Sequence, residues 1–177
     1  MKLIGITGWS GAGKTTLLAR LIPELTGRGV RVSTVKHAHH AFDIDVPGKD
    51  SHRHRMAGAS EVLISSGRRF ALVHELRGET EWSLPQLLGR LAPADLVLVE
   101  GFKRERHPKI EVYRRANGKP PLHPGDATIR AIAADCAFPE AGRPVLALDA
   151  APVIADAVLA LAEPAAQVFP EAAPWRN

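Results

Sequence analysis

The residues from Gly8 to Thr15 have the types and spacing that bind phosphate. Their sequence, Gly8-Trp9-Ser10-Gly11-Ala12-Gly13-Lys14-Thr15, matches the pattern G-x-x-x-x-G-K-[ST]. The glycines permit positive φ angles, so successive backbone N–H groups can point inward at an anion. In this pattern the lysine reaches the β- and γ-phosphates and the hydroxyl binds Mg²⁺. We therefore expect a nucleotide polyphosphate, whose base the pattern leaves open, to contact Gly8, Gly11, Ala12, Gly13, Lys14, Thr15 and Thr16.

A carboxylate follows the most apolar short run of the chain. Leu96-Val97-Leu98-Val99 is typical of a strand buried on both faces, and Glu100 comes directly after it. A strand that ends in an acid is common, but beside a phosphate-binding loop it supplies the acidic element of a Mg²⁺ site. We expect Lys14 and Glu100 to carry the chemistry, and Thr15 and Glu100 to hold the metal. The pattern leaves open whether Glu100 binds Mg²⁺ directly, binds it through water, or orients an attacking water.

Histidines and aspartates gather in one polar stretch of the chain. His37, His39 and His40 precede Asp43 and Asp45. The favoured interpretation is a loop that folds over the phosphates, in which Asp43 or Asp45 approaches Mg²⁺. A solvated polar loop is the plain alternative. A zinc site is disfavoured because no cysteine lies near the histidines.

Alternating strands and helices must position these residues. A strand at 2–7, a helix at 14–28 and a strand at 30–36 form a βαβ unit. We expect a kink at Pro23 or a broken second half of the helix. The further elements expected are a helix at 50–57, hairpin strands at 61–65 and 69–75, a helix at 83–91, strands at 95–99, 110–113, 128–133 and 145–148, and a helix at 151–161. The fold class is α/β, a three-layer P-loop NTPase fold with a mostly parallel sheet and an edge β-hairpin.

One domain accounts for most of the chain. Residues 1–162 are expected to form the nucleotide-binding domain, and residues 163–177 an Ala/Pro-rich, loosely ordered tail. The hairpin at about 60–75 lies at an expected sheet edge, where it could pair with a second copy and give a symmetric homodimer.

Composition narrows the class of protein. The chain has 177 residues, 45% of them apolar and 24% charged, which is ordinary for a globular domain. We expect a cytoplasmic protein without a membrane partner, because the single Cys136 forms no internal disulfide and no apolar run approaches the ~20 residues of a membrane span. The net charge of +4 suggests nucleic acid, but the basic residues are dispersed and only 5% of residues are aromatic. Nucleic acid is therefore not an expected partner.

The sequence resembles the molybdopterin-guanine dinucleotide biosynthesis adaptor family (MobB) in five motifs, which occur in family order between about residues 2 and 135. The motifs are Gly8-Trp9-Ser10-Gly11-Ala12-Gly13-Lys14-Thr15-Thr16, Lys36-His37-Ala38-His39-His40, Asp45-Val46-Pro47-Gly48-Lys49-Asp50-Ser51, Ala57-Gly58-Ala59 and Leu98-Val99-Glu100-Gly101-Phe102-Lys103. The resemblance implies a dimeric protein that binds GTP with Mg²⁺, hydrolyses it weakly and assists the molybdenum cofactor guanylyltransferase, which joins GMP to molybdopterin. Molybdopterin itself is a further candidate ligand.

The resemblance also carries roles onto single residues. It implies that Lys14, Thr15 and Glu100 bind phosphate and Mg²⁺, with Asp45 a further metal ligand. It implies that Asp135 accepts hydrogen bonds from guanine N1 and N2, although an aspartate that simply ends a strand is the alternative. A basic patch that serves the anionic pterin or the transferase would comprise Lys103, Arg104, Arg106 and Lys109.

A P-loop small-molecule kinase is the alternative function. Such kinases carry an arginine-rich lid, which Arg104, Arg106, Arg114 and Arg115 could supply.

Overall fold

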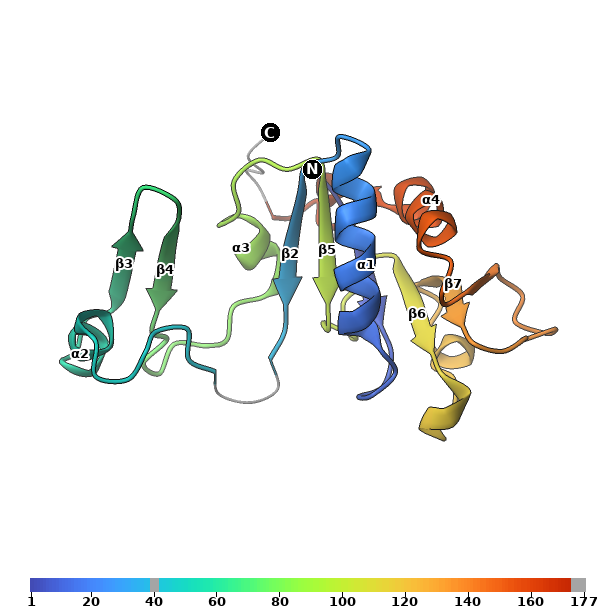
Figure 1. Ribbon diagram of the computed structural model, residues 1–177, viewed down its shortest axis with the longest axis horizontal. Coiled ribbons are helices and arrows are strands. Elements are labelled where there is room, and N and C mark those ends of the chain that lie inside the picture. Colours follow the sequence, from blue (N-terminus) through green and yellow to red (C-terminus); the bar gives the residue numbers. More distant parts are fainter. Residues whose placement is uncertain (39–41, 173–177) are drawn as a thin grey trace. The chain divides into compact units, whose positions relative to one another are not determined.

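The chain contains two compact units in this computed structural model, which describes residues 1–38 and 42–172 (Figure 1). The larger unit consists of Met1–His37 and Leu84–Asn177, and the smaller unit is Ala38–Ser83. His39 and His40 lie outside the described residues, so their expected role stays a prediction.

A seven-stranded sheet forms the centre of the larger unit. Six strands are parallel in the order β2-β5-β1-β6-β7-β8, and β9 pairs antiparallel with β1. The strands are β1 (Lys2–Thr7), β2 (Val32–Lys36), β5 (Leu96–Glu100), β6 (Lys109–Tyr113), β7 (Ile129–Ala134), β8 (Val145–Ala147) and β9 (Glu163–Pro164). The mostly parallel sheet that the sequence predicts is confirmed.

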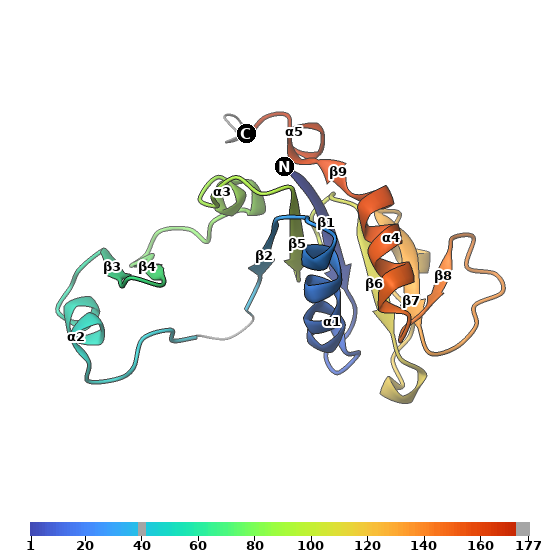
Figure 2. The ribbon, with the colours of Figure 1, turned by 45° about the horizontal axis from the view of Figure 1, so that its top comes forward.

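Helices cover both faces of this sheet. One hydrophobic core joins it to α1 (Lys14–Gly27) and α4 (Ala151–Leu161), which lie in front of the strands in Figure 2. A second core joins its other face to α3 (Leu84–Leu88) and α5 (Ala165–Val168). Two short 3₁₀ helices, η1 (Arg115–Asn117) and η2 (His123–Gly125), follow β6. The expected three-layer α/β architecture is therefore present.

Side-chain periodicity explains these layers. Along β1, Ile4 faces the core with α1 and α4, whereas Leu3 faces the opposite core, as the two-residue period of a strand requires. In α1, Leu21 and Leu25 lie one turn apart and are both fully buried. The helix continues through Pro23, so the alternative of a broken second half is wrong, and the alternative of a kink stays a prediction. A proline inside a helix costs about 3 kcal/mol, and each buried leucine returns about 1.5–3 kcal/mol.

The expectation of a loosely ordered tail is wrong for residues 163–169. Glu163–Pro164 form β9, and α5 follows directly. Val168 and Phe169 are buried in the core with α3. Apolar residues at this spacing anchor the segment, although its Ala/Pro composition suggested otherwise.

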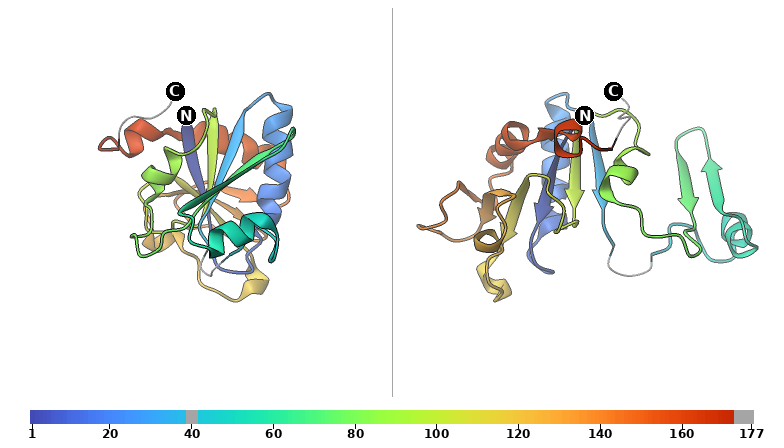
Figure 3. Two further views of the ribbon diagram at one scale, coloured as in Figure 1. Left: turned by 90° about the vertical axis from the view of Figure 1, so that its left-hand side faces the viewer. Right: turned by 180° about the vertical axis from the view of Figure 1, so that it is seen from behind.

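The smaller unit contains one helix and the predicted hairpin. Helix α2 (Asp50–Met56) precedes β3 (Glu61–Ser65) and β4 (Phe70–His74), which pair antiparallel and are drawn side by side in Figure 3. The hairpin hydrogen-bonds as its own two-stranded sheet instead of extending the central one. Among the residues that the structure describes, no helix has the length and apolar character needed to cross a membrane.

Candidate phosphate-binding site

The glycine-rich loop connects β1 to α1 and has the backbone shape that its sequence predicts. Gly8, Gly11 and Gly13 have φ angles of 144°, 79° and 97°. A Cβ atom on Gly8 would lie only 2.5 Å from the carbonyl oxygen of Val112, so a larger residue cannot fit without displacing β6. Gly13 precedes the first residue of α1, and its carbonyl accepts a hydrogen bond from the N–H of Leu17 (2.9 Å). The loop therefore ends where the positive end of the helix dipole begins.

The Lys14 side chain lies along this loop. Its Nζ donates hydrogen bonds to the carbonyl oxygens of Gly8 (3.1 Å) and Trp9 (2.9 Å). Burial lowers the pKa of Lys14 below its ordinary value; the charge of Glu100 opposes this shift, and the charges of Lys103 and Lys36 add to it. Three cations thus gather around one acid, which makes this end of the sheet attractive to a polyanion.

Thr15 and Glu100 meet at the mouth of the loop. The Thr15 hydroxyl donates a hydrogen bond of 3.2 Å to the Glu100 carboxylate. The sheet register explains the contact, because Glu100 pairs with Ile6 near the end of β1 and with Lys36 at the end of β2. The carboxyl ends of these parallel strands form one edge, which brings residues 85 positions apart into contact.

The Thr15–Glu100 pair has the chemistry that Mg²⁺ requires. Mg²⁺ binds oxygen ligands, and in nucleotide sites the protein supplies one or two of them while phosphates and water supply the rest. A hydroxyl and a carboxylate separated by 3.2 Å meet this requirement. The described residues contain no group of three or more His, Cys, Asp and Glu side chains arranged around a metal position. The site suits a metal that arrives with its nucleotide better than one held by protein alone.

A segment after β6 supports the loop from the side. Asn117 Nδ2 donates to the carbonyl oxygen of Ser10 (3.0 Å), and Trp9 Nε1 donates to that of Pro120 (2.7 Å). Lys103 Nζ lies 5.0 Å from the centre of the Trp9 ring, a cation–π distance. Sequence reasoning missed the roles of Asn117 and Pro120, because they lie more than 100 residues from their partners and belong to no motif.

Asp135 follows β7 at the same edge of the sheet. Its Oδ1 accepts a hydrogen bond from the N–H of Arg115 (2.8 Å). Together with Arg114 and Asp149, it lines a cavity of about 570 Å³ between α1 and the ends of β7 and β8. A cavity of this volume is large enough for a small organic ligand.

His37 and Gly101 form a tight contact behind Glu100. Gly101 has a φ of 94°, and a Cβ built on it would lie 2.8 Å from the Cβ of His37. The His37 ring packs on Phe102 with 4.9 Å between ring centres. The first histidine of the polar stretch thus braces the turn that follows Glu100.

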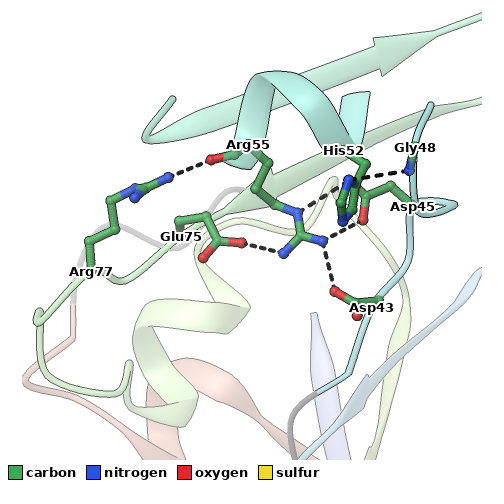
Figure 4. Close-up of polar contacts among 7 residues, drawn as sticks. All are labelled: Asp43, Asp45, Gly48, His52, Arg55, Glu75 and Arg77. Atoms are coloured by element: carbon green, nitrogen blue, oxygen red, sulfur yellow. Dashed lines mark hydrogen bonds and ion pairs between the residues drawn. The ribbon is translucent and has the colours of Figure 1, made fainter. Parts of the chain in front are cut away.

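The smaller unit places the other predicted metal ligand, Asp45, in an arginine-centred cluster (Figure 4). Arg55 donates to both carboxylate oxygens of Asp45 (2.8 and 3.2 Å), and also to Asp43 (2.7 Å) and Glu75 (2.9 Å). The hydrogen bonds from Arg55 are the main reason that the pKa of Asp45 is lowered. The Asp45 carboxylate is therefore ionised but occupied by a guanidinium, so its predicted role at Mg²⁺ would require release from Arg55.

The predicted basic patch is only partly available. Lys109 is buried, where it donates to Thr128 Oγ1 (2.6 Å) and lies 3.6 Å from the Asp126 carboxylate. Arg106 is paired with Glu171. The inclusion of Lys109 was wrong, because a charged residue in a strand appears exposed until its buried partners are known. Lys103 and Arg104 remain accessible.

The phosphate-binding loop connects β1 to α1 in a mostly parallel sheet that helices cover on both faces. This arrangement places the chain in the class of P-loop NTPase folds. Residues 3–135 match the family described as "Molybdopterin guanine dinucleotide synthesis protein B" (MobB), and the chain belongs to that family.

Two curated relatives agree with this assignment. The chain is 46% identical over 121 residues to the molybdopterin-guanine dinucleotide biosynthesis adapter protein of Escherichia coli (strain K12), covering 67% of this chain and 69% of that protein. It is 44% identical over 160 residues to the adapter protein of the same description from Haemophilus influenzae, covering 87% and 85%. A crystal structure of molybdopterin-guanine biosynthesis protein B superimposes with a TM-score of 0.72 and 30% identity, covering 90% of this chain and 99% of that one. The family resemblance read from the motifs and the fold class are thereby confirmed.

Proposed function

We propose that this protein binds GTP with Mg²⁺ in the cytoplasm and assists the transferase that attaches GMP to molybdopterin. The observation that carries the proposal is the hydrogen bond between Thr15 and Glu100 at the mouth of the loop, in a chain of the MobB family. This pair meets the requirements of a magnesium nucleotide, and the family supplies the pathway in which the nucleotide is used.

The phosphates would be held chiefly by backbone. Backbone N–H groups between Gly8 and Thr16 surround the polyphosphate, and the ammonium group of Lys14 neutralises the charge on its outer oxygens. Thr15 and Glu100 would hold Mg²⁺, which draws charge away from the phosphates when bound.

Hydrolysis is expected to be slow. In efficient GTPases a glutamine commonly orients the attacking water. The only two glutamines of this chain, Gln86 and Gln167, belong to α3 and α5 on one face of the sheet. Glu100 instead lies at the carboxyl end of β5. Glu100 is then the residue best placed to order a water, which suits an adaptor with residual GTPase activity.

Asp135 is the residue proposed to recognise guanine. The N–H of Arg115 donates to Oδ1 and holds the carboxylate at the cavity wall. Each carboxylate oxygen can accept two hydrogen bonds, so Oδ2 and the second acceptor site of Oδ1 can serve a ligand. A carboxylate accepts hydrogen bonds from guanine N1–H and N2–H, whereas adenine presents no such pair of donors. We therefore expect Asp135 to favour GTP over ATP.

The hairpin is the proposed dimer contact. Leu63 of β3 lies opposite Leu72 of β4, and Phe70 lies on the same face of the hairpin. The exposed fractions of these side chains are 63% for Leu63, 45% for Leu72 and 73% for Phe70. An apolar strand face of this kind is stabilised by a partner, and a second copy of the hairpin supplies one. Light scattering coupled to size exclusion checks this proposal, because a monomer at micromolar concentration would contradict it.

Titration calorimetry with GTP and ATP tests the nucleotide assignment. In the presence of Mg²⁺ the wild-type protein should bind GTP more tightly than ATP, and Lys14→Ala should weaken GTP binding about 100-fold. Lys2→Ala is the matched control, because Lys2 is exposed at the opposite end of β1. Tighter binding of ATP, or wild-type affinity in Lys14→Ala, would overturn the proposal.

A small-molecule kinase is the second candidate, favoured by the Arg114 guanidinium beside Gly13. Incubation with γ-labelled GTP and a metabolite panel separates the two functions. Slow release of free phosphate alone supports the adaptor, whereas a labelled metabolite supports the kinase.

A further inference from the structure

Arg114 lies between the phosphate-binding loop and the cavity beside Asp135. It is the first residue after β6, at the same sheet edge as the loop. A Cβ built on Gly13 would lie 3.4 Å from Arg114 Nη2 and 3.8 Å from its Nε. The guanidinium therefore packs over the backbone at the start of α1. The same side chain lines the cavity of about 570 Å³.

The backbone around Arg114 is held in place on both sides. The N–H of Arg115 donates to Asp135 (2.8 Å), and the N–H of Asn117 donates to the carbonyl oxygen of Arg114 (3.0 Å). The Asn117 side chain in turn donates to Ser10 within the loop (3.0 Å). These bonds fix the distance between the base of the Arg114 side chain and the cradle.

The polar donors of the Arg114 guanidinium are available to a ligand. It forms no hydrogen bond or ion pair with any residue that the structure describes. Several other arginines of the chain are paired with carboxylates, as Arg28 is with Asp156 and Arg31 with Asp95. A planar guanidinium presents five donors, and its preferred partners are carboxylate and phosphate.

The position between the two spaces identifies the group that Arg114 would bind. The loop holds the outer phosphates through Lys14, and the cavity has the volume for a purine and its ribose. The group that connects these two parts of a nucleotide is the α-phosphate. We propose that Arg114 binds the α-phosphate and positions the nucleotide between the cradle and the cavity. This inference rests on the proposed nucleotide-binding function.

The test compares nucleotides that differ in phosphate number. The affinities of GTP, GDP, GMP and guanosine are measured on the full-length protein with Mg²⁺, for wild type, Arg114→Ala and Arg114→Lys. The control is Arg115→Ala, which removes the exposed neighbouring arginine side chain but keeps its N–H bond to Asp135.

We expect Arg114→Ala to weaken GTP, GDP and GMP by one common factor of about 10- to 100-fold, and to leave guanosine unchanged. Arg114→Lys should recover part of this loss, because lysine keeps the charge but not the fork of donors. Arg115→Ala should change each affinity by less than about threefold.

Three results would overturn the inference: wild-type affinities in Arg114→Ala, a loss confined to GTP, or an equal loss for guanosine. The second would place Arg114 at the γ-phosphate, and the third would place it at the base. If the wild-type protein binds no GTP, that result contradicts the proposed function itself and not only the role of Arg114. Unfolding of each variant without nucleotide is followed by circular dichroism, and Arg114→Lys carries the test if the alanine variant is unstable.

Discussion

His107 is a buried imidazole whose surroundings exclude its charged form. Its side chain is fully buried, and within the described part of the chain neither ring nitrogen has a hydrogen-bond partner. The ring packs against β1, where a Cβ on Gly5 would lie 2.5 Å from Nε2. Burial, with the charge of Lys109 adding to it, lowers the pKa of His107 from 6.5 to about 3. We predict that this histidine makes the fold sensitive to acid.

The sign and size of the effect follow from proton linkage. In the unfolded chain the imidazole takes up a proton near pH 6.5, whereas in the folded protein it stays neutral down to about pH 3. The stability that depends on neutral His107 is therefore present above pH 6.5 and is lost as the pH falls toward 3. One such proton changes the free energy of unfolding by up to 1.36 kcal/mol per pH unit, so His107 alone should remove about 2 kcal/mol between pH 7 and pH 5.

Urea unfolding at pH 5, 6 and 7 checks this prediction. His107→Leu should lose stability less steeply than wild type, by about 2 kcal/mol over this range. At pH 7 it should be at least as stable, because an apolar side chain of similar volume leaves no buried polar atom unsatisfied. His54→Gln, at an exposed histidine of α2, serves as the control and should follow the wild-type curve. Parallel curves for wild type and His107→Leu, or an NMR pKa of 6 or above for His107 in the folded protein, would refute the reasoning.

Three further substitutions probe other features. Gly101→Ala should lower the free energy of unfolding by about 2–4 kcal/mol, because Gly101 has a φ of 94° and the new Cβ would lie 2.8 Å from a histidine side chain. Denaturant unfolding measures this change. The control is Gly27→Ala at the open end of α1, which should be neutral or slightly stabilising. Glu100→Gln should raise the Mg²⁺ concentration needed for half-maximal GTP binding about tenfold while sparing metal-free binding; an unchanged Mg²⁺ titration would exclude Glu100 from the metal site. Arg55→Ala should speed amide exchange at least about tenfold in the loop before α2, which its carboxylate contacts restrain; equal exchange in Arg55→Ala and the exposed-neighbour control Arg53→Ala would contradict this.

Local patterns in the sequence predict the centre of the site and the fold around it. The glycine-rich loop is defined by consecutive residues, so its position between β1 and α1 can be predicted directly from the pattern. The contact between Thr15 and Glu100 is also predictable, because the carboxyl ends of neighbouring parallel strands share one edge. Strand and helix periods depend on residues two to four positions apart, and a short window captures them.

Features that depend on distant residues could not be predicted in this way. No motif indicates that Arg114 packs beside Gly13 or that Asn117 bonds to the loop, because these contacts arise only when β6 lies next to β1. The capture of Asp45 by Arg55 is similar, since several arginines of the chain were equally plausible partners for that carboxylate. Lys109 was misjudged for the same reason, because its burial depends on Asp126, 17 positions later in the sequence.

The pairing of β9 with β1 has a consequence for how the chain is made. Toward its carboxyl end β1 pairs with β6, but at its amino end Lys2 and Leu3 pair with Pro164 and Glu163. The strand that leads into the phosphate cradle thus depends, for part of its edge, on a partner that lies about 160 residues later in the sequence. Until β9 has been synthesised, the amino end of β1 therefore keeps a short unpaired edge in the nascent chain.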